Sequence, residues 1–263
     1  MLNRDRLIVA LDVSSATQAR QIVQSIGESA STYKIGKQLF TAEGPQVVRD
    51  LVSSGRKVFL DLKFHDIPNT VSGAVAEAAK LGVSMLTVHA SGGSKMLKAA
   101  AEAAAQSASK PMVLAVTVLT SLSDADLAEL GIAGHVATQV LRLGSLARHA
   151  GCGGLVASAL EARELRRELG NDFAIVTPGI RMGGPHLPAV GKCGESGSVG
   201  APPLSPSFGD RVGLRLDDQA RVLTPREAIA AGATYLVVGR PILEAPDPAQ
   251  AAAAIVSEIG GPG

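Results

Sequence analysis

The sequence predicts an α/β fold in which eight strands alternate with eight helices and close into a single (β/α)8 barrel. Three observations support this prediction. Short apolar runs rich in β-branched residues alternate along the chain with Ala-rich segments of helical periodicity. The apolar runs are nearly continuous, as is typical of parallel strands that are buried on both faces. The length of 263 residues also fits a barrel of this type, which forms one domain of about 250 residues.

The expected elements follow one another in a regular order. The expected strands cover residues 7–12, 32–36, 57–63, 84–89, 112–119, 154–158, 174–178 and 235–239. The expected helices fill the intervals at 15–26, 44–54, 70–81, 93–107, 137–150, 159–169, 225–231 and 248–259. Eight such units in one domain spanning 1–263 favour a closed TIM barrel. A doubly wound open sheet is the alternative, but no Gly-x-Gly-x-x-Gly motif follows the first strand.

Residues 182–216 break this pattern. The segment is rich in Gly, Pro and Ser and has no periodicity, and its roughly 35 residues far exceed the usual connection of about 4–6. It follows the seventh expected strand, on the face where barrel active sites form. We expect a loop insertion near a phosphate site that acts as a lid or lies within one, and a tolerated insertion without function is the alternative.

Composition excludes several classes of function. A net charge of +1 gives no reason for binding to nucleic acid or to a membrane surface, and the absence of Trp argues against a base-stacking platform. No apolar run approaches the roughly 18 residues of a membrane span. Cys152 and Cys193 form neither a disulfide framework nor a zinc motif. Without a signal peptide at the start of the sequence, a cytoplasmic location is expected.

Charged residues gather where the first three strands end. Asp61 and Lys63 lie two apart on the third strand, so both should project to one side at the carboxyl end of the barrel, and Asp66 follows in the loop. Lys34 lies near the end of the neighbouring strand, within reach of Asp61, and Asp12 ends the first. Carboxylates around Lys63 favour its protonated form, which can deliver a proton to a carbanion. An ordinary salt bridge at the barrel rim is the alternative reading of this cluster.

The last two strands predict a phosphate site. Barrels often bind phosphate with the loops after strands seven and eight. Gly239 lets the backbone approach an anion closely, and Arg240 offers a charge-assisted contact. Arg181 follows strand seven beside that position. His89 ends strand four and is expected to be a core residue or an indirect support of the site. Because lysines alternate with the carboxylates, we expect no metal.

With these motifs in view, the chain resembles the orotidine 5′-phosphate decarboxylase family. The resemblance runs from about Leu7 to about Ala251, without the long loop, and the twelve-residue block around Lys63 is highly specific. The matching segments are Ile8-Val9-Ala10-Leu11-Asp12, Lys34-Ile35-Gly36-Lys37, Phe59-Leu60-Asp61-Leu62-Lys63-Phe64-His65-Asp66-Ile67-Pro68-Asn69-Thr70, Val88-His89-Ala90-Ser91-Gly92-Gly93, Val118-Leu119-Thr120-Ser121, Thr177-Pro178-Gly179-Ile180-Arg181 and Val238-Gly239-Arg240-Pro241.

The resemblance implies an enzyme that decarboxylates orotidine 5′-phosphate to uridine 5′-phosphate in pyrimidine biosynthesis without a cofactor. It implies that Asp61 lies against the substrate carboxylate and that Lys63 protonates C6. The other implied contacts are Asp12 and Lys34 with the ribose, Thr120 and Ser121 with the pyrimidine, Arg240, Gly239 and Gln219 with the phosphate, and Pro178 and Arg181 beside them. It further implies a homodimer in which Asp66, Ile67 and Thr70 complete the partner's site.

Two rival functions remain open at this point. A sugar-phosphate decarboxylase or aldolase on the same barrel shares the Asp-x-Lys-x-x-Asp motif, but such relatives use Mg2+ and a further acidic ligand that this sequence does not suggest. A non-catalytic nucleotide-binding protein is the second rival. It would not require alternating charges such as those of Lys34, Asp61 and Lys63.

Overall fold

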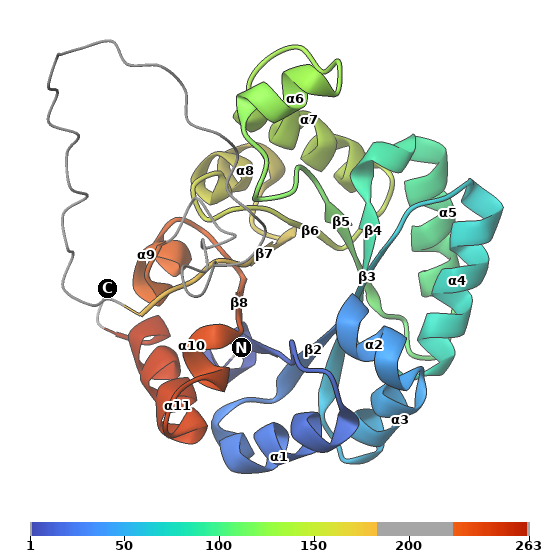
Figure 1. Cartoon of the computed structure of the whole chain (residues 1–263). Coiled ribbons are helices and arrows are strands. Elements are labelled where there is room, and N and C mark those ends of the chain that lie inside the picture. Colours follow the sequence, from blue (N-terminus) through green and yellow to red (C-terminus); the bar gives the residue numbers. More distant parts are fainter. Residues whose placement is uncertain (1, 183–222, 262–263) are drawn as a thin grey trace, which may run out of the picture.

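The computed structural model describes residues 2–182 and 223–261. Eight parallel strands close into a barrel in sequence order, with β8 hydrogen-bonded to β1 (Figure 1). The strands are β1 (Leu7–Ala10), β2 (Thr32–Gly36), β3 (Lys57–Phe64), β4 (Met85–His89), β5 (Met112–Val116), β6 (Gly154–Val156), β7 (Ala174–Thr177) and β8 (Tyr235–Val238). The predicted barrel is confirmed, and the alternative of an open sheet is wrong.

Helices surround the strands as a ring (Figure 1). They are α1 (Ala16–Ile26), α2 (Lys37–Glu43), α3 (Gln46–Ser53), α4 (Pro68–Lys80), α5 (Gly93–Gln106), α6 (Asp124–Glu129), α7 (Val136–His149), α8 (Ala162–Leu169), α9 (Pro225–Ala230), α10 (Arg240–Leu243) and α11 (Pro248–Ile259), with 3-10 turns η1 (Asn3–Arg6), η2 (Gly27–Ser29) and η3 (Ala90–Gly92). None of these helices is long and apolar enough to cross a membrane.

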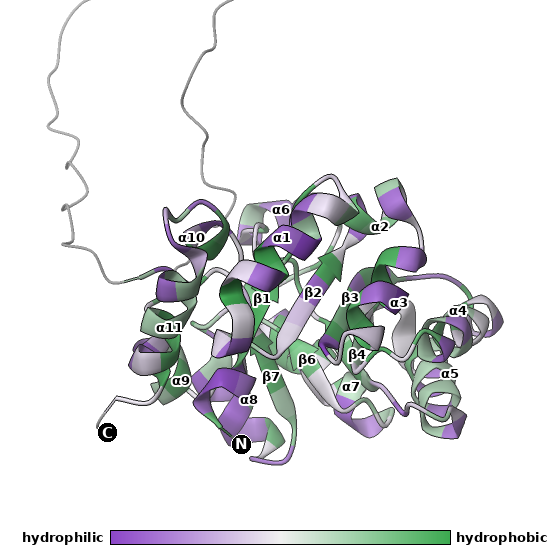
Figure 2. Ribbon diagram, turned by 90° about the horizontal axis from the view of Figure 1, so that it is seen from below, coloured by the Kyte–Doolittle hydropathy of each residue, from purple (hydrophilic) through white to green (hydrophobic). Residues whose placement is uncertain are grey.

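Apolar side chains form two layers. Those that point into the barrel make a small cluster around Ile8, Phe59 and Val176, and those that point outward pack against the helices in the larger cluster. Figure 2 shows the result, with hydrophobic strands inside and a mostly hydrophilic outer helix in α8. Since both faces of the strands are buried, the nearly continuous apolar runs of the sequence are explained.

Three short helices were not expected from the sequence: α2, α6 and α10. The start of α6 does carry a sequence signal. Ser123 accepts a hydrogen bond from the backbone N–H of Asp126, and the Asp126 carboxylate accepts one from the backbone N–H of Ser123, which is a capping box. The expected strand over 112–119 ends at Val116 instead, because the chain leaves the sheet there and forms part of the rim of the barrel.

The predicted insertion at 182–216 lies outside the described residues except for Met182, and so does Gln219. Its place near a phosphate site and the extent of the domain over 1–263 stay predictions. The described chain re-enters the barrel at Leu223, which forms an isolated parallel bridge with Ile180. Ile180 and Leu223, which flank the undescribed segment, are therefore adjacent where β7 ends.

Candidate active site

The carboxyl ends of the strands surround a cleft of about 730 Å³. Most of the residues predicted for the site line this cleft, although they come from six different strand ends. They are Asp12, Lys34, Asp61, Lys63, Thr120, Pro178, Arg181, Gly239 and Arg240. The structure thus gathers the charged residues of the first three strands and the candidate phosphate residues of the last two around one cavity.

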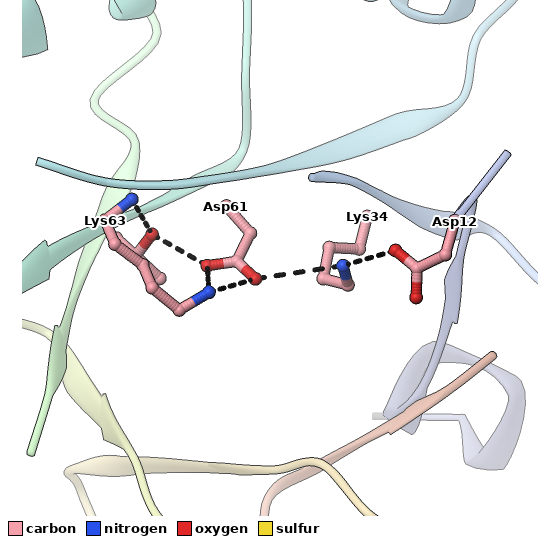
Figure 3. A network of polar contacts seen from close by, with 5 residues as sticks. Asp12, Lys34, Asp61 and Lys63 are labelled. Atoms are coloured by element: carbon pink, nitrogen blue, oxygen red, sulfur yellow. Dashed lines mark hydrogen bonds and ion pairs between the residues drawn. The ribbon is translucent and has the colours of Figure 1, made fainter. Parts of the chain in front are cut away.

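Two carboxylates and two lysines alternate in a row along one wall of the cleft (Figure 3). Lys34 Nζ lies 3.0 Å from Asp12 Oδ1 and 3.8 Å from Asp61 Oδ2. Lys63 Nζ lies 2.8 Å from both carboxylate oxygens of Asp61. Asp61 is therefore held between two cations, and its side chain is only 13% exposed.

An irregularity in β3, and not a regular strand, brings Lys63 to Asp61. Leu60 pairs with Leu86 of β4, but Phe64 pairs with Val88, so that three residues of β3 lie opposite Thr87 alone. Lys63 occupies this bulge with φ +55°, a left-handed conformation that is uncommon for residues other than glycine. Both side chains lie on the same side, as strand alternation predicts, but the left-handed conformation of Lys63 was not predicted.

Thr87 fills the space opposite the bulge. Its hydroxyl donates a hydrogen bond to Asp61 Oδ1 at 2.9 Å and accepts one from the backbone N–H of Lys63 at 2.9 Å. The side chain is completely buried. Thr87 was not predicted as a site residue, although a hydroxyl among the apolar residues Met85, Leu86 and Val88 of β4 was a signal that it needed a buried partner.

The lysines decide the charge state of Asp61. Burial raises the pKa of this carboxyl group, but the charges of Lys63 and Lys34 and the hydrogen bonds from Lys63 and Thr87 outweigh burial, so that the pKa lies below its ordinary value. Asp61 therefore carries its negative charge throughout the neutral range. Any further anion that enters the cleft beside it meets a fixed negative charge.

Apolar side chains also line the cleft. Val116 and Val156 contribute from β5 and β6, Val118 from the loop after β5, and Phe59 from β3, together with polar residues such as Thr120. Apolar lining excludes water, and charges interact more strongly where water is excluded. The row of charges thus lies in a cavity that is lined in part by apolar side chains.

Two glycines let the charged row pack closely. A Cβ atom added at Gly36 would lie 3.1 Å from Lys34 Nζ and 3.5 Å from Asp12 Oδ1. One added at Gly239 would lie 3.4 Å from Asp12 Oδ2. Both positions therefore keep space around the Asp12–Lys34 ion pair, and Gly239 does so directly before Arg240.

Four of the predicted residues do not line this cleft. Asp66, Ile67 and Thr70 are exposed around the start of α4, and the Ile67 side chain is 67% exposed although it is large and apolar. Asp66 Oδ1 accepts a hydrogen bond from the backbone N–H of Ile67. Ser121, next to Thr120, is exposed as well.

His89 is not the fully buried core residue that was one of the two expectations. It is half-buried, and its ring lies 5.3 Å from that of His65, centroid to centroid. Burial, followed by the charges of His65, Lys37 and Lys63, lowers its pKa. Among the residues that the structure describes, no three His, Cys, Asp or Glu side chains are placed to hold a metal ion.

A closed barrel whose strand ends converge on a charged cleft is typical of (β/α)8 enzymes. The family model of the orotidine 5′-phosphate decarboxylase / HUMPS family matches residues 5–202 and 192–255 of this sequence. The chain belongs to this family.

Curated relatives cover nearly the whole chain. It is 46% identical over 258 residues to orotidine 5′-phosphate decarboxylase of Nitrosococcus oceani, which covers 98% of this chain and 99% of that protein. The enzyme of the same name from Idiomarina loihiensis is 46% identical over 97% of this chain and 98% of its own length. A solved structure of orotidine 5′-phosphate decarboxylase from Lactobacillus acidophilus superimposes with a TM-score of 0.78 at 36% identity, covering 98% of this chain and 100% of that one.

These comparisons confirm the family predicted from the sequence. At the level of the family they also confirm the enzyme class, a carboxy-lyase, and the expected reaction of pyrimidine biosynthesis.

Proposed function

We propose that this chain decarboxylates orotidine 5′-phosphate to uridine 5′-phosphate, and that the row Asp12, Lys34, Asp61 and Lys63 carries out the chemistry. The observation that supports this most is the placement of the Asp61 carboxylate between two lysines in a cleft that apolar side chains line in part. The volume of the cleft, about 730 Å³, suits a small nucleotide.

The lining of the cleft suggests an orientation for the nucleotide. In this proposal Gly239, Arg240 and Arg181 bind the phosphate together with Gln219, and Pro178 lies beside them. Asp12 and Lys34 then face the ribose hydroxyls, one as an acceptor and the other as a donor. Thr120 and Ser121 address the pyrimidine. Binding energy from the phosphate, remote from the reacting carbon, helps to hold the carboxylate against Asp61.

Asp61 opposes the carboxylate that leaves. Two like charges about 4 Å apart repel by about 4 kcal/mol at an effective dielectric of about 20. The repulsion disappears as the carboxylate becomes neutral CO2, so that it is present in the bound substrate and absent from the products. An interaction that raises the ground state and not the transition state lowers the barrier of the chemical step.

Lys63 stabilises and then protonates the carbanion that remains. When the bond between C6 and the carboxylate breaks, CO2 leaves and the pair stays on C6. The ammonium group of Lys63 stabilises this charge and then transfers a proton to C6, which gives uridine 5′-phosphate and a neutral amine. The amine regains its proton from solvent. Every atom of the reaction is accounted for without an electron-accepting cofactor.

The direct test measures the loss of orotidine 5′-phosphate absorbance with purified protein in the presence and absence of EDTA. We expect equal rates, whereas complete loss of activity with EDTA would favour the Mg2+-dependent sugar-phosphate rival. Lys63→Ala should abolish turnover and leave binding of uridine 5′-phosphate largely intact. Near-normal turnover in that variant would contradict the role of Lys63.

We also propose a cytoplasmic homodimer in which each chain completes the site of the other. The support is that Asp66, Ile67 and Thr70 belong to the same specific sequence block as Lys63 but are exposed outside its own cleft. Such an interface would also bury the large apolar side chain of Ile67, which is 67% exposed in the single chain. Two-fold symmetry would apply the same exchange to both sites.

Mixing two inactive variants tests this exchange. Lys63→Ala chains and Asp66→Ala chains are each expected to be inactive. In a random mixture half of the dimers are heterodimers, each with one intact site, so that about a quarter of the parent activity should return. If no activity returns although subunits have exchanged, Asp66 does not serve the partner's site.

A further inference from the structure

Lys63 is one of two non-glycine residues with positive φ in the described part of the chain, and the other, Lys110, lies at a turn before β5. A residue in this conformation persists only where its surroundings hold it there, and such residues cluster at functional sites. The bulge also takes the backbone N–H of Lys63 out of the regular pairing between β3 and β4. A group outside the ladder of strand hydrogen bonds must therefore accept a hydrogen bond from this N–H and stabilise the left-handed conformation of Lys63.

The Thr87 hydroxyl meets both requirements. It accepts the hydrogen bond of the Lys63 N–H and donates its own proton to the Asp61 carboxylate. One fully buried side chain therefore binds the backbone of the proposed proton donor and the side chain of the proposed opposing charge. A carboxylate cannot donate, so the direction of the second hydrogen bond is fixed, and the hydroxyl oxygen remains available to the N–H.

We propose that Thr87 is a positioning residue of the decarboxylation site, whose hydroxyl holds the β3 bulge and so sets Lys63 against Asp61. This inference rests on the proposed function of Lys63 and Asp61. Thr87 lies behind Asp61, below the lining of the cleft, so that it acts through its two partners and not on the substrate. Without the hydroxyl, the partly buried N–H of Lys63 loses this acceptor and the left-handed conformation loses its support.

Substitution of the hydroxyl alone tests the proposal. Thr87→Val keeps the shape of the side chain and removes both hydrogen bonds. We expect kcat to fall by about 10²-fold, the loss typical of misplacing a reacting group by about 1 Å, and KM to change by less than about threefold because the residues proposed to bind the phosphate are untouched. Thr87→Ser restores the hydroxyl and should recover most of kcat.

The control is Thr177→Val. Thr177 is equally buried at the end of β7, but its hydroxyl has no hydrogen-bond partner in the described chain, so the same chemical change should leave kcat unchanged. If Thr87→Val does not fold, as judged by thermal unfolding, Thr87→Cys takes its place, since Ser and Cys have nearly the same shape and differ in hydrogen bonding. Equal kcat in the Ser and Cys variants, or in Thr87→Val and the parent, overturns the proposal.

A crystal structure of Thr87→Val separates this inference from the proposed function. If the parent protein does not decarboxylate orotidine 5′-phosphate, the proposed function fails, and the structure of the variant still reports on Thr87. We expect Lys63 to leave the left-handed region and its Nζ to move from Asp61. A variant that retains φ near +55° and the 2.8 Å contact shows that Thr87 does not position Lys63.

Discussion

Asp61→Asn is the sharpest perturbation of the charged row. The substitution keeps the size of the side chain and an oxygen that can accept the hydrogen bond of Thr87. It removes the negative charge that lies 2.8 Å from Lys63 Nζ and 3.8 Å from Lys34 Nζ. The two lysines then lie together in a partly buried cleft, where their side chains are 25% and 12% exposed, with Asp12 as the remaining carboxylate.

The size of the effect follows from these distances. At an effective dielectric of about 20, Coulomb's law gives about 6 kcal/mol for the Lys63 contact and about 4 kcal/mol for the Lys34 contact. The cost of burying the charges offsets much of this sum, and removing one partner of a buried ion pair typically destabilises a protein by about 3–5 kcal/mol. We therefore expect Asp61→Asn to lose about 3 kcal/mol at pH 7, or about 6 °C or more in Tm.

The pH dependence of the free energy of unfolding shows whether the charge of Asp61 causes the loss of stability. The folded-state pKa of Asp61 lies below its unfolded value of about 3.8, so its contribution is fully present above that value and is lost as pH falls through the folded pKa. The difference between the variant and the parent should therefore shrink as pH falls below about 3.8. Urea unfolding at fixed protein concentration measures this, with Asp172→Asn, an exposed partner of Arg148, as the control with a smaller loss. Equal stability at pH 7, or an undiminished difference at pH 3, would refute the reasoning.

Three further predictions concern groups away from the cleft. Burial raises the pKa of Cys152 to about 12 from 9.0, so little of its thiol is in the reactive thiolate form. In a Cys193→Ser background a thiol reagent should therefore modify the native protein about 10³-fold more slowly than the unfolded chain, and comparable rates would contradict this. Arg166 donates hydrogen bonds to the carbonyl oxygens of Gly170, Phe173 and Gly232. Arg166→Met should therefore lower the free energy of unfolding, measured in urea, by about 3 kcal/mol. The control Arg163→Met, at an exposed position, should lower it by less than about 0.5 kcal/mol. A Cβ atom at Gly154 would lie 2.5 Å from the carbonyl oxygen of Ala174, so Gly154→Ala should lower the free energy of unfolding by about 1–3 kcal/mol. At Gly73, on the open face of α4, a Cβ atom meets nothing, so Gly73→Ala should raise the free energy of unfolding by about 1 kcal/mol. Thermal unfolding measures both changes.

Most of the fold was predictable because one physical rule governs each strand. A parallel barrel strand is buried on both faces, so every expected strand overlaps an observed one. The ends were less predictable, since apolar residues continue past the last strand hydrogen bond into the cleft, as Val118 and Leu119 do after β5. Helix α2 was missed because it follows β2 directly at Lys37, without a turn signal to separate the two.

The site was predictable where charge and strand position coincide. Asp12, Lys34 and Asp61 lie at the ends of three adjacent strands, and parallel strands bring their carboxyl ends together. The left-handed conformation of Lys63 was not predictable, because it depends on the register between β3 and β4 and on Thr87, which is 24 residues away in the sequence. Local patterns contain no information about such long-range pairings.

The two lysines beside Asp61 also matter for catalysis, because they keep Asp61 charged when the substrate carboxylate binds next to it. A substrate carboxylate close to Asp61 raises the pKa of Asp61, because a second negative charge disfavours the ionised form. If Asp61 took up a proton in response, the repulsion between the two carboxylates would vanish. The two lysines prevent this by starting the pKa lower.

Removing one of these lysines should therefore move the pH profile. In Lys34→Met the pKa of Asp61 in the substrate complex rises, so the acid limb of kcat should shift to higher pH, in addition to any loss of maximal rate. The limb of kcat, and not that of kcat/KM, is the relevant measurement because it reports the enzyme–substrate complex. If Asp61 acted only by its shape, the limb would stay where it is in the parent. A limb that does not move in Lys34→Met would thus contradict the role of charge repulsion at Asp61.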